Sequence, residues 1–229
     1  MKKIVFLTGA GVSAESGIRT FRDSDGLWEN YRVEDVATID AWYRNPGLML
    51  KFYNERRAQL ECAKPNQAHV LIAELEKNFD VTVVTQNIDN LHEQAGSTDI
   101  IHLHGECTKV RPQDSDGSFG VIDIGYKPVN LGDADSRGVQ LRPHIVWFGE
   151  GVPMMEPAIR AVSQADILVI VGTSMVVYPA AGLVNYVRMG TPIYLIDPKP
   201  INLNIPGFTQ IQEPATTGMQ KLVGILGIR

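Results

Sequence analysis

Residues 4–18 read I-V-F-L-T-G-A-G-V-S-A-E-S-G-I, an apolar run that passes directly into a glycine-rich turn. The run Ile4–Thr8 is apolar without alternation, which is typical of a strand covered on both faces. Glycines in the turn Gly9–Ile18 allow main-chain N–H groups to approach a pyrophosphate, and Ala14 stands where a dinucleotide fingerprint accepts Gly or Ala. The segment indicates either a phosphate-binding unit or only a tight turn.

The chain after this turn does not fit a plain hydride-transfer enzyme. The dehydrogenase fingerprint requires a helix, a second strand and an acidic residue about 20 residues further on. Here the chain continues from Thr20 as T-F-R-D-S-D-G-L-W.

The rest of the chain alternates strands with helices. Further apolar runs predict buried strands at Val81–Thr85, Ile100–Leu103, Ile167–Val171 and Ile193–Ile196. Helical patterns cover Gln67–Lys77, Ala180–Met189 and Thr217–Leu226. This alternation predicts an α/β fold with a Rossmann-like, doubly wound parallel sheet.

Two stretches interrupt that rhythm. Residues 22–60 are rich in aromatic side chains and contain a helix opened by Asn45-Pro46, whereas residues 106–142 are rich in Asp, Gly and Ser with little periodicity. We expect both to be insertions that form a small lobe over the mouth of the sheet. The chain 1–229 would then be one catalytic domain, whose large lobe consists of residues 1–21, 61–105 and 143–229.

Composition excludes several classes of protein. With 44% hydrophobic and 21% charged residues, the chain matches a globular protein and not a disordered or fibrous one. A net charge of −5 argues against a broad basic face, so we expect no nucleic acid partner. The run Ile4–Leu7 is too short for a signal peptide, and no run approaches a membrane span. We therefore expect a cytoplasmic protein with no membrane partner.

Polar side chains follow two of the predicted strands. T-Q-N-I-D spans Thr85–Asp89 and H-L-H-G begins at His102. Ligands in open α/β sheets gather at the carboxyl ends of strands, and a histidine with a pKa near neutrality suits proton transfer, so His104 is the candidate base. His102 and His104 would share one face of a strand, which also suggests a metal pair, but no third ligand is evident. For His102 we prefer a structural hydrogen-bonding role.

Five segments, taken in order, resemble the sirtuins, the NAD-dependent protein-lysine deacylases. They are G-A-G-V-S-A-E-S-G-I-R-T-F-R from Gly9, T-Q-N-I-D-N-L-H-E-Q-A-G-S from Thr85, H-L-H-G from His102, V-W-F-G-E from Val146 and G-T-S-M-V-V-Y-P-A from Gly172. The resemblance covers essentially the whole chain and is strongest to the short bacterial and archaeal branch. It implies that NAD binds between the two lobes and that an acyl-lysine of a protein enters from the opposite side.

The resemblance also implies roles for individual residues. Asn87 and His104 would be catalytic, with His104 helping to deprotonate a ribose hydroxyl. Asp197 stands where sirtuins commonly have Asn, and a carboxylate there would repel a 2′-phosphate and favour NAD over NADP. For a single polar residue at a strand end, a structural cap is the alternative. The cofactor-binding set would be Gly9, Ala10, Gly11, Phe21, Arg22, Trp28, Gln86, Asn87, Ile88, Asp89, Gly172, Thr173, Ser174, Asp197 and Ala215.

Two further segments would contact the acylated substrate. By resemblance, Val146–Glu150 is a strand whose Val146, Phe148 and Gly149 pair with the peptide main chain, opposite Met175–Val177; a buried apolar strand is the alternative. Tyr53 and Arg56 in Y-N-E-R are spaced i, i+3, so a phenol and a guanidinium can converge on one carboxylate. They resemble an acidic-acyl site, which predicts succinyl- or malonyl-lysine above acetyl-lysine. The alternative is a packed Tyr beside a solvated Arg.

Many sirtuins hold a structural zinc with two C-x-x-C pairs, but this chain has only Cys62 and Cys107. Cys107 would be one remaining ligand, with Val110 in the place of the second. Between residues 106 and 150 only Cys107 and His144 could supply the usual four Cys or His ligands, so we expect no zinc. The carboxylates of this segment do not match a calcium loop and predict a solvated acidic loop.

The sequence thus predicts an NAD-dependent protein-lysine deacylase that releases nicotinamide and O-acyl-ADP-ribose. Two other functions stay open at this point: an NAD-dependent protein ADP-ribosyltransferase and a non-catalytic NAD-binding module.

Overall fold

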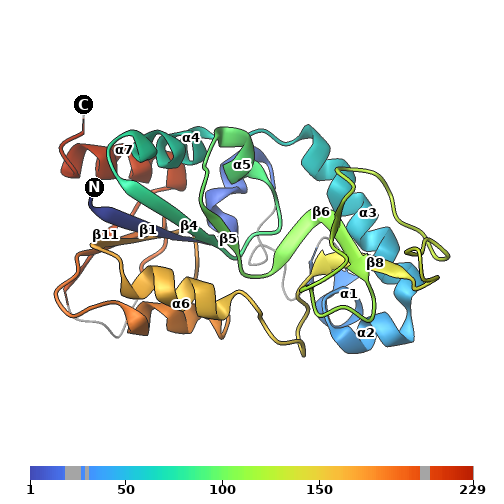
Figure 1. The fold of residues 1–229 in the computed structure, drawn as a ribbon. Helices are drawn as coiled ribbons and strands as arrows, with labels where there is room; N and C mark the ends of the chain where they lie inside the picture. Colours follow the sequence, from blue (N-terminus) through green and yellow to red (C-terminus); the bar gives the residue numbers. More distant parts are fainter. Residues whose placement is uncertain (19–26, 29–30, 202–206, 229) are drawn as a thin grey trace.

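A six-stranded parallel sheet forms the centre of the molecule (Figure 1). The structure, a computed structural model, describes residues 1–18, 27–28, 31–201 and 207–228. The sheet order is β11-β10-β9-β1-β4-β5, so the chain winds outward from β1 in both directions. This is the doubly wound, Rossmann-like α/β fold expected from the sequence. The strands are β1 (Lys3–Thr8), β4 (Asp80–Thr85), β5 (Ile100–His102), β9 (Ile167–Val171), β10 (Ile193–Ile196) and β11 (Phe208–Ile211).

All five predicted strands are present, with ends that move by at most a residue. The sixth, β11, has no apolar run to reveal it. Its sequence F-T-Q-I is short and lies at the edge of the sheet, where Thr209 is exposed. An edge strand needs less apolar sequence than a central one because only one neighbour and part of each face cover it.

Helices cover both faces of the sheet. On one face lie α4 (Gln67–Glu74) and α7 (Ala215–Ile225), and on the other α6 (Met155–Ser163) and the 3-10 helix η4 (Ala180–Tyr186) (Figure 1). The predicted helix 67–77 is α4 followed by the 3-10 turn η3 (Leu75–Lys77), and that at 217–226 is α7. The predicted helix 180–189 is 3-10 and ends at Tyr186; α6 and the short α5 (Leu91–Ala95) were not predicted.

The side chains of β1 explain why its sequence shows no alternation. Ile4 and Phe6 pack with α4 and α7, whereas Val5 and Leu7 pack with α6 and η4. All four are fully buried. Because successive side chains of a strand point to opposite faces, a strand covered twice must be apolar at every position.

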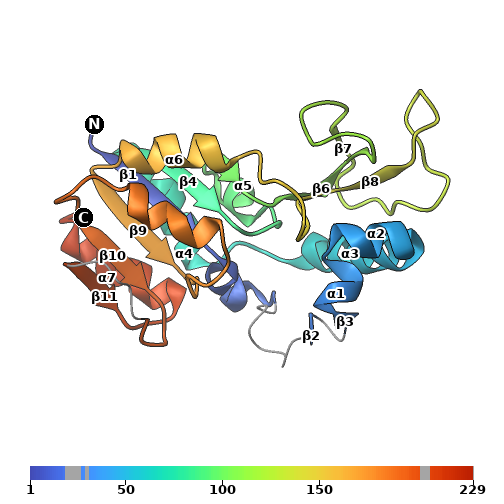
Figure 2. The ribbon, with the colours of Figure 1, turned by 90° about the horizontal axis from the view of Figure 1, so that it is seen from below.

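A smaller group of elements lies beside the sheet (Figure 2). Its core contains Trp42, Phe52, Tyr53 and Trp147. The α3 helix begins as expected after Asn45, whose Oδ1 accepts a hydrogen bond from the Leu48 N–H at 3.0 Å. The elements are β2 (Leu27–Trp28), β3 (Tyr31–Arg32), α1 (Val33–Val36), α2 (Ile39–Arg44), α3 (Pro46–Cys62), β6 (Gly105–Pro112), β7 (Ile122–Asp123) and β8 (Leu141–Ile145). The lobe limits 22–60 and 106–142 stay a prediction.

The segment 106–142, which shows little periodicity, contains a three-stranded antiparallel sheet in the order β7-β6-β8. Its long turns use the carboxylates that the sequence predicts to form a solvated acidic loop. Asp135 Oδ1 accepts from the Arg137 N–H at 2.8 Å, and the Arg137 guanidinium donates to both oxygens of Asp114 at 3.0 Å. Turns of this kind carry no hydrophobic period, which is why the strands between them are hard to detect in the sequence.

Among the described residues, no helix has both the length and the apolar character that crossing a bilayer requires.

Candidate functional site

A cavity of about 1150 Å³ opens at the carboxyl ends of the central strands. It lies where the winding of the sheet reverses between β1 and β9, the usual ligand position in open α/β sheets. Tyr53 and Trp147, which belong to the core of the smaller group of elements, line it as well. The predicted site residues that line it are Gly9, Ala10, Gly11, Tyr53, Arg56, Gln86, Asn87, Ile88, Asp89, His104, Val146, Phe148, Gly149, Gly172, Thr173, Ser174, Asp197 and Ala215.

Three of the predicted residues lie wholly or partly outside the described part of the chain. Phe21 and Arg22 lie outside the described residues. Trp28 belongs to β2, but its side chain lies outside the described part of the chain.

The glycine turn after β1 packs closely against the end of β9. The Gly9 N–H donates to Val171 O at 3.0 Å, and the Gly11 N–H donates to Gly172 O at 2.8 Å. A Cβ on Gly9 would lie 2.7 Å from Thr173 Cβ, and one on Gly11 would lie 2.6 Å from Gly172 Cα. Gly172 has a φ of +61°, which disfavours any side chain. Glycine is therefore needed at these positions because the two main chains approach each other closely where they line the cavity.

Ser13 lies at the centre of a buried polar network. Its Oγ donates to Asp89 Oδ2 at 2.9 Å and accepts from Asn87 Nδ2 at 3.1 Å. The Nε2 of His69 lies 3.4 Å from the same oxygen, while Nδ1 of His69 accepts from the Asn66 N–H. The hydroxyl thus uses its one hydrogen and both lone pairs. It fixes two predicted site residues relative to the glycine turn.

The sequence analysis assigned no role to Ser13 or His69. Ser13 stands inside the quoted G-A-G-V-S stretch, and a hydroxyl among glycines was the available signal. His69 lies within an ordinary helical pattern, so nothing in the sequence distinguishes it.

Burial raises the pKa of Asp89, although its hydrogen bonds from Leu91 and Ser13 act in the opposite direction.

His104 faces the cavity just after β5. Its Nδ1 lies 2.9 Å from Gln86 O, which can only accept, so Nδ1 carries the hydrogen and Nε2 keeps its lone pair. Burial lowers the pKa of His104 below its ordinary value. The ring is therefore neutral at pH 7 and able to accept a proton from a bound group.

Side chains at the ends of the neighbouring strands complete this wall. Thr173 Oγ1 accepts from Gln86 Nε2 at 3.1 Å, which links the ends of β4 and β9. Asp197 follows β10, is 3% exposed, and accepts from the Lys199 N–H at 3.0 Å through Oδ1. Ala215 is the first residue of α7.

Tyr53 and Arg56 both line the cavity from α3, as their spacing predicts. The Tyr53 hydroxyl accepts from Trp147 Nε1 at 2.8 Å, and burial raises the pKa of this phenol. Arg56 is 8% exposed, and its Cζ lies 5.2 Å from the centre of the Phe52 ring. The alternative of a solvated arginine is therefore wrong.

The segment Val146–Glu150 is not a strand, which corrects the expectation from sequence. Main-chain groups of Phe148 are already paired, since its N–H donates to Ala37 O at 2.9 Å and its carbonyl accepts from the Ile39 N–H at 3.1 Å. The chain then turns, because the Glu150 N–H donates to Trp147 O. Phe148 is 48% exposed beside the cavity, so the alternative of a buried strand is wrong too.

The cysteines do not fit a zinc site. Cys107 is fully buried in the small-lobe core with its Sγ 3.9 Å from Tyr53 O, and burial raises its pKa to about 11. Cys62 is exposed at the end of α3.

Charged side chains lie together, largely removed from solvent, beside the Val146–Glu150 turn. Arg142 donates to both oxygens of Glu150, at 2.7 and 2.8 Å, and its Cζ lies 3.5 Å from the centre of the Trp147 ring. Arg111 lies 3.4 Å from Glu150 Oε1. These contacts join β6 and β8 to the Val146–Glu150 turn.

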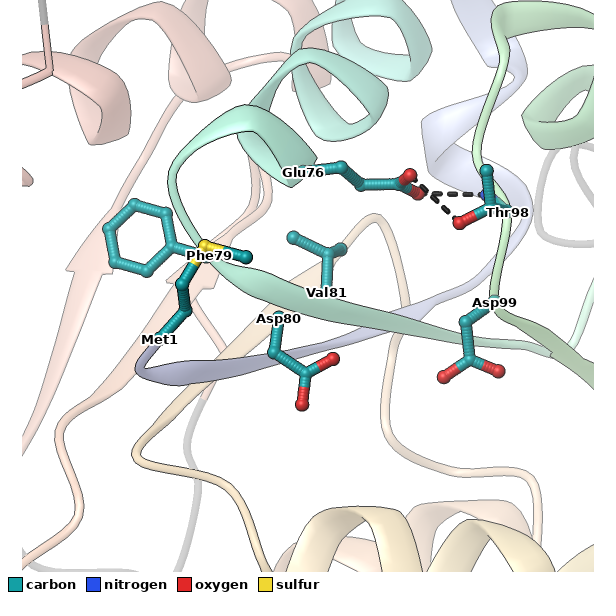
Figure 3. Close-up of a pocket in the computed structure, with 7 residues that line it drawn as sticks. All are labelled: Met1, Glu76, Phe79, Asp80, Val81, Thr98 and Asp99. Atoms are coloured by element: carbon teal, nitrogen blue, oxygen red, sulfur yellow. Dashed lines mark hydrogen bonds between the residues drawn. The ribbon is translucent and has the colours of Figure 1, made fainter.

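A second hollow, of about 410 Å³, lies at the opposite, amino-terminal end of the sheet (Figure 3). Glu76 accepts there from the main-chain N–H and the hydroxyl of Thr98, at 2.8 and 2.9 Å. Its carboxylate is therefore engaged in a structural cap, far from the glycine turn. The hollow is lined by Met1, Glu76, Phe79, Asp80, Val81, Thr98 and Asp99.

Known proteins resemble this chain over nearly its whole length. The Sir2 family profile matches residues 9–179. A protein of Bacteroides thetaiotaomicron named NAD-dependent protein deacylase is 53% identical, over 99% of this chain and 98% of that protein. A Helicobacter pylori protein of the same name is 50% identical, over 97% and 96%.

Solved structures agree with these relatives. A Sir2 homologue in complex with NAD superposes with a TM-score of 0.88 and 40% identity, covering 99% of this chain and 90% of that one. A mutant Sir2 homologue in complex with ADP-ribose gives a TM-score of 0.90 and 39% identity, covering 100% and 94%. The chain belongs to the Sir2 family.

Proposed function

We propose that this protein is an NAD-dependent protein-lysine deacylase of the short bacterial and archaeal branch. The observation that carries the proposal is His104, whose Nδ1 is held by Gln86 O while its ring faces the cavity that also contains the glycine turn. Relatives named NAD-dependent protein deacylase, 50–53% identical over almost the whole chain, support it.

The residues around the cavity fit NAD. A Cβ on Gly9, Gly11 or Gly172 would collide with the segment that faces it, so these glycines let the two turns pack closely at the wall of the cavity. Asp197 is placed to accept hydrogen bonds from ribose hydroxyls, and its charge would repel a 2′-phosphate. A cavity of about 1150 Å³ exceeds the roughly 300–1000 Å³ of ordinary ligand sites, which leaves room for a second substrate. When bound, NAD supplies a ribose carbon from which nicotinamide leaves as the acyl oxygen attacks.

The residues of this chain would then orient the cofactor and remove a proton from one of its ribose hydroxyls. His104 takes a proton from a ribose hydroxyl through Nε2. Asn87 and Asp89, both held by Ser13 at the end of β4, would orient the bound cofactor. The acyl-lysine would extend along Val146, Phe148 and Gly149, opposite Met175–Val177, with the cavity lying between the two lobes.

A mass-spectrometric product assay tests this function. Incubation with NAD and an acyl-lysine peptide should give free lysine peptide, nicotinamide and O-acyl-ADP-ribose. ADP-ribose attached to protein would instead identify an ADP-ribosyltransferase. Absence of nicotinamide release with every acyl peptide would identify a binding module, and either result would overturn the proposal.

The acyl group is, we propose, an acidic one such as succinyl or malonyl. Arg56 places a guanidinium at the cavity wall although it is 8% exposed, and Tyr53 offers a phenol one helical turn away. A guanidinium at the wall of the cavity can bind a carboxylate of the acyl group through paired hydrogen bonds.

Replacing Arg56 with Met tests the acyl preference. Arg56→Met should lower kcat/KM for a succinyl peptide by roughly 10–100-fold, the value of a charge-assisted hydrogen bond, and affect an acetyl peptide much less. Arg44→Met is the control, because Arg44 is an exposed arginine of the small lobe. Unaltered succinyl activity in Arg56→Met would show that the carboxylate site is wrong.

A further inference from the structure

The two histidines of H-L-H-G contact two successive main-chain carbonyl groups of the loop that follows β4. His104 Nδ1 lies 2.9 Å from Gln86 O, and His102 Nδ1 lies 3.3 Å from Asn87 O. His104 lines the cavity, whereas His102 lies behind the loop with its side chain 9% exposed. His102 therefore contacts the site from outside.

The other nitrogen of His102 has an acceptor as its partner as well. Its Nε2 lies 2.6 Å from Glu93 Oε1 on α5. A carbonyl oxygen and an ionised carboxylate can only accept hydrogen bonds. Both ring nitrogens must then carry hydrogen, so this geometry requires the imidazolium form of His102.

The surrounding charges support that form. Glu106 of β6 lies near the ring, and Lys109 Nζ lies 2.7 Å from Glu106 Oε2. Asp89 is a further acidic group that interacts with the ring, while His92, which burial keeps neutral, adds no positive charge. Burial would lower the pKa of His102, but Glu93 and Glu106 outweigh it and raise the pKa above its ordinary value.

Ligand atoms of Glu93, His102 and Glu106 lie within 4.8 Å of one another, a spacing that could suit a metal ion. A protonated ring has no lone pair to bind one. Lys109 and the imidazolium together balance the two carboxylates. A charge-neutral ion-pair cluster therefore accounts for the arrangement better than a cation site.

We propose that His102, held as an imidazolium by Glu93, is a positioning residue that fixes the main chain of Asn87 for catalysis. The proposal rests on the deacylase function given above. Asn87 is also held by Thr85 Oγ1, which accepts from its N–H at 3.0 Å, and by Ser13. Release of its carbonyl would let the Asn87 side chain shift at the cavity wall. Loss of the His102 proton should thus slow turnover.

The experiment is the pH profile of kcat and of KM for NAD, measured with an acyl peptide from pH 6 to pH 10 on the full chain. Glu93→Gln removes the negative charge but keeps an oxygen acceptor, so the pKa of His102 should fall. We expect the alkaline limb of kcat to move down by about one pH unit or more, the effect of one close charge. The acid limb, which His104 sets, should stay in place. His102→Gln should abolish the shifted limb and lower kcat at all pH values.

Glu76→Gln is the matched control. Glu76 is also a hydrogen-bonded, half-buried carboxylate, but it lies at the opposite end of the sheet (Figure 3). Its profile should superimpose on that of the wild type. An alkaline limb that is the same in Glu93→Gln and wild type would overturn the positioning role.

A second readout does not depend on activity. Imidazole NMR of ¹⁵N-histidine-labelled protein should show His102 doubly protonated at pH 7 in the wild type, with its titration moved to lower pH in Glu93→Gln. A neutral His102 in the wild type at pH 7 would overturn the inference, even if Glu93→Gln failed to fold. A charged His102 in a protein without deacylase products would instead indicate that the proposed function is wrong.

Discussion

The hydroxyl of Ser13 accepts from Asn87, gives its own hydrogen to Asp89 and contacts His69 Nε2. A single oxygen therefore joins the glycine turn, the loop after β4 and the start of α4. His104 is held differently, by one main-chain carbonyl, so its ring depends less on this network. A substitution at His104 should accordingly affect the chemistry more than the architecture.

His104→Ala should reduce turnover on the order of a hundred- to ten-thousand-fold, because a positioned base is lost. NAD affinity, measured by calorimetry, and the midpoint of thermal unfolding should remain close to the wild-type values. Nicotinamide release at saturating substrate is the measurement. Near-normal release by a folded variant would contradict the assignment of His104 as the base.

The site could be read from the sequence where it follows strands. Gln86, Asn87, Asp89 and His104 were found because polar residues after apolar runs stand out. Ser13, which holds two of them, could not be assigned, since its partners lie 74 and 76 positions away and no local pattern connects them. Pairwise contacts across the fold are the part of a site that a single sequence does not encode visibly.

Among the elements, the antiparallel sheet β7-β6-β8 is held by buried charges as well as by its apolar core. Glu150 accepts from Arg142 twice and lies beside Arg111. Burial would raise the pKa of Glu150, but Arg142 and Arg111 lower it below the ordinary value, so it is ionised at pH 7. Removing this one carboxylate would leave two buried guanidinium groups without their shared partner.

Glu150→Gln should lower the free energy of unfolding on the order of 3 kcal/mol, the lower part of the range for breaking a buried ion pair. Urea unfolding followed by circular dichroism measures it. Glu156→Gln is the control, because Glu156 pairs with Arg160 on the exposed face of α6 and should cost only a few tenths of a kcal/mol. Equal losses in the two variants would contradict a stabilising role for the buried cluster.

Metal removal should leave this lobe intact. Cys107 is enclosed in the core, and Arg142 with Glu150 joins β8 to the Val146–Glu150 turn. Treatment with a chelator is expected to change neither the unfolding midpoint nor deacylation, and elemental analysis of tag-free protein should find no stoichiometric zinc. Stoichiometric zinc, or loss of activity on chelation, would refute this.

For the molecule as a whole, the sheet was predictable and the small lobe was only partly so. Strands such as β1 and β9 are covered on two faces, so their sequences are continuous apolar runs that are easy to recognise as strands. By contrast, β6–β8 and the Val146–Glu150 turn are set by contacts between distant segments, including the pairing of Phe148 with Ala37 and Ile39. Local sequence gives such segments no distinctive period.

Acid should begin to destabilise the fold at a higher pH than titration of the carboxylates alone would predict. Burial lowers the pKa of His69 to about 4 and, together with nearby Arg111, that of His144 to about 4. Between pH 6.5 and pH 4 the unfolded chain therefore binds more protons than the native one. The free energy of unfolding should therefore decrease as the pH is lowered through this window, by about 3 kcal/mol for His69. Below the window this contribution should level off.

His69→Gln tests this pH dependence. The variant should lose stability less steeply between pH 6.5 and pH 4.5 in urea titrations. Carboxylates such as Glu150, whose pKa is lowered, release their contribution only at lower pH, so they do not mask the effect. Parallel slopes for wild type and variant would show that His69 does not supply the linkage.

The central position of β1 has a consequence for biosynthesis. The strand is synthesised before both of its neighbours, and the second of them, β9, begins only at Ile167. Until then one edge of β1 and much of the apolar surface on both faces stay uncovered. Open strand edges recruit other chains. A nascent chain that already contains β1 therefore needs shielding by chaperones, or rapid translation, until β9 emerges to cover that edge.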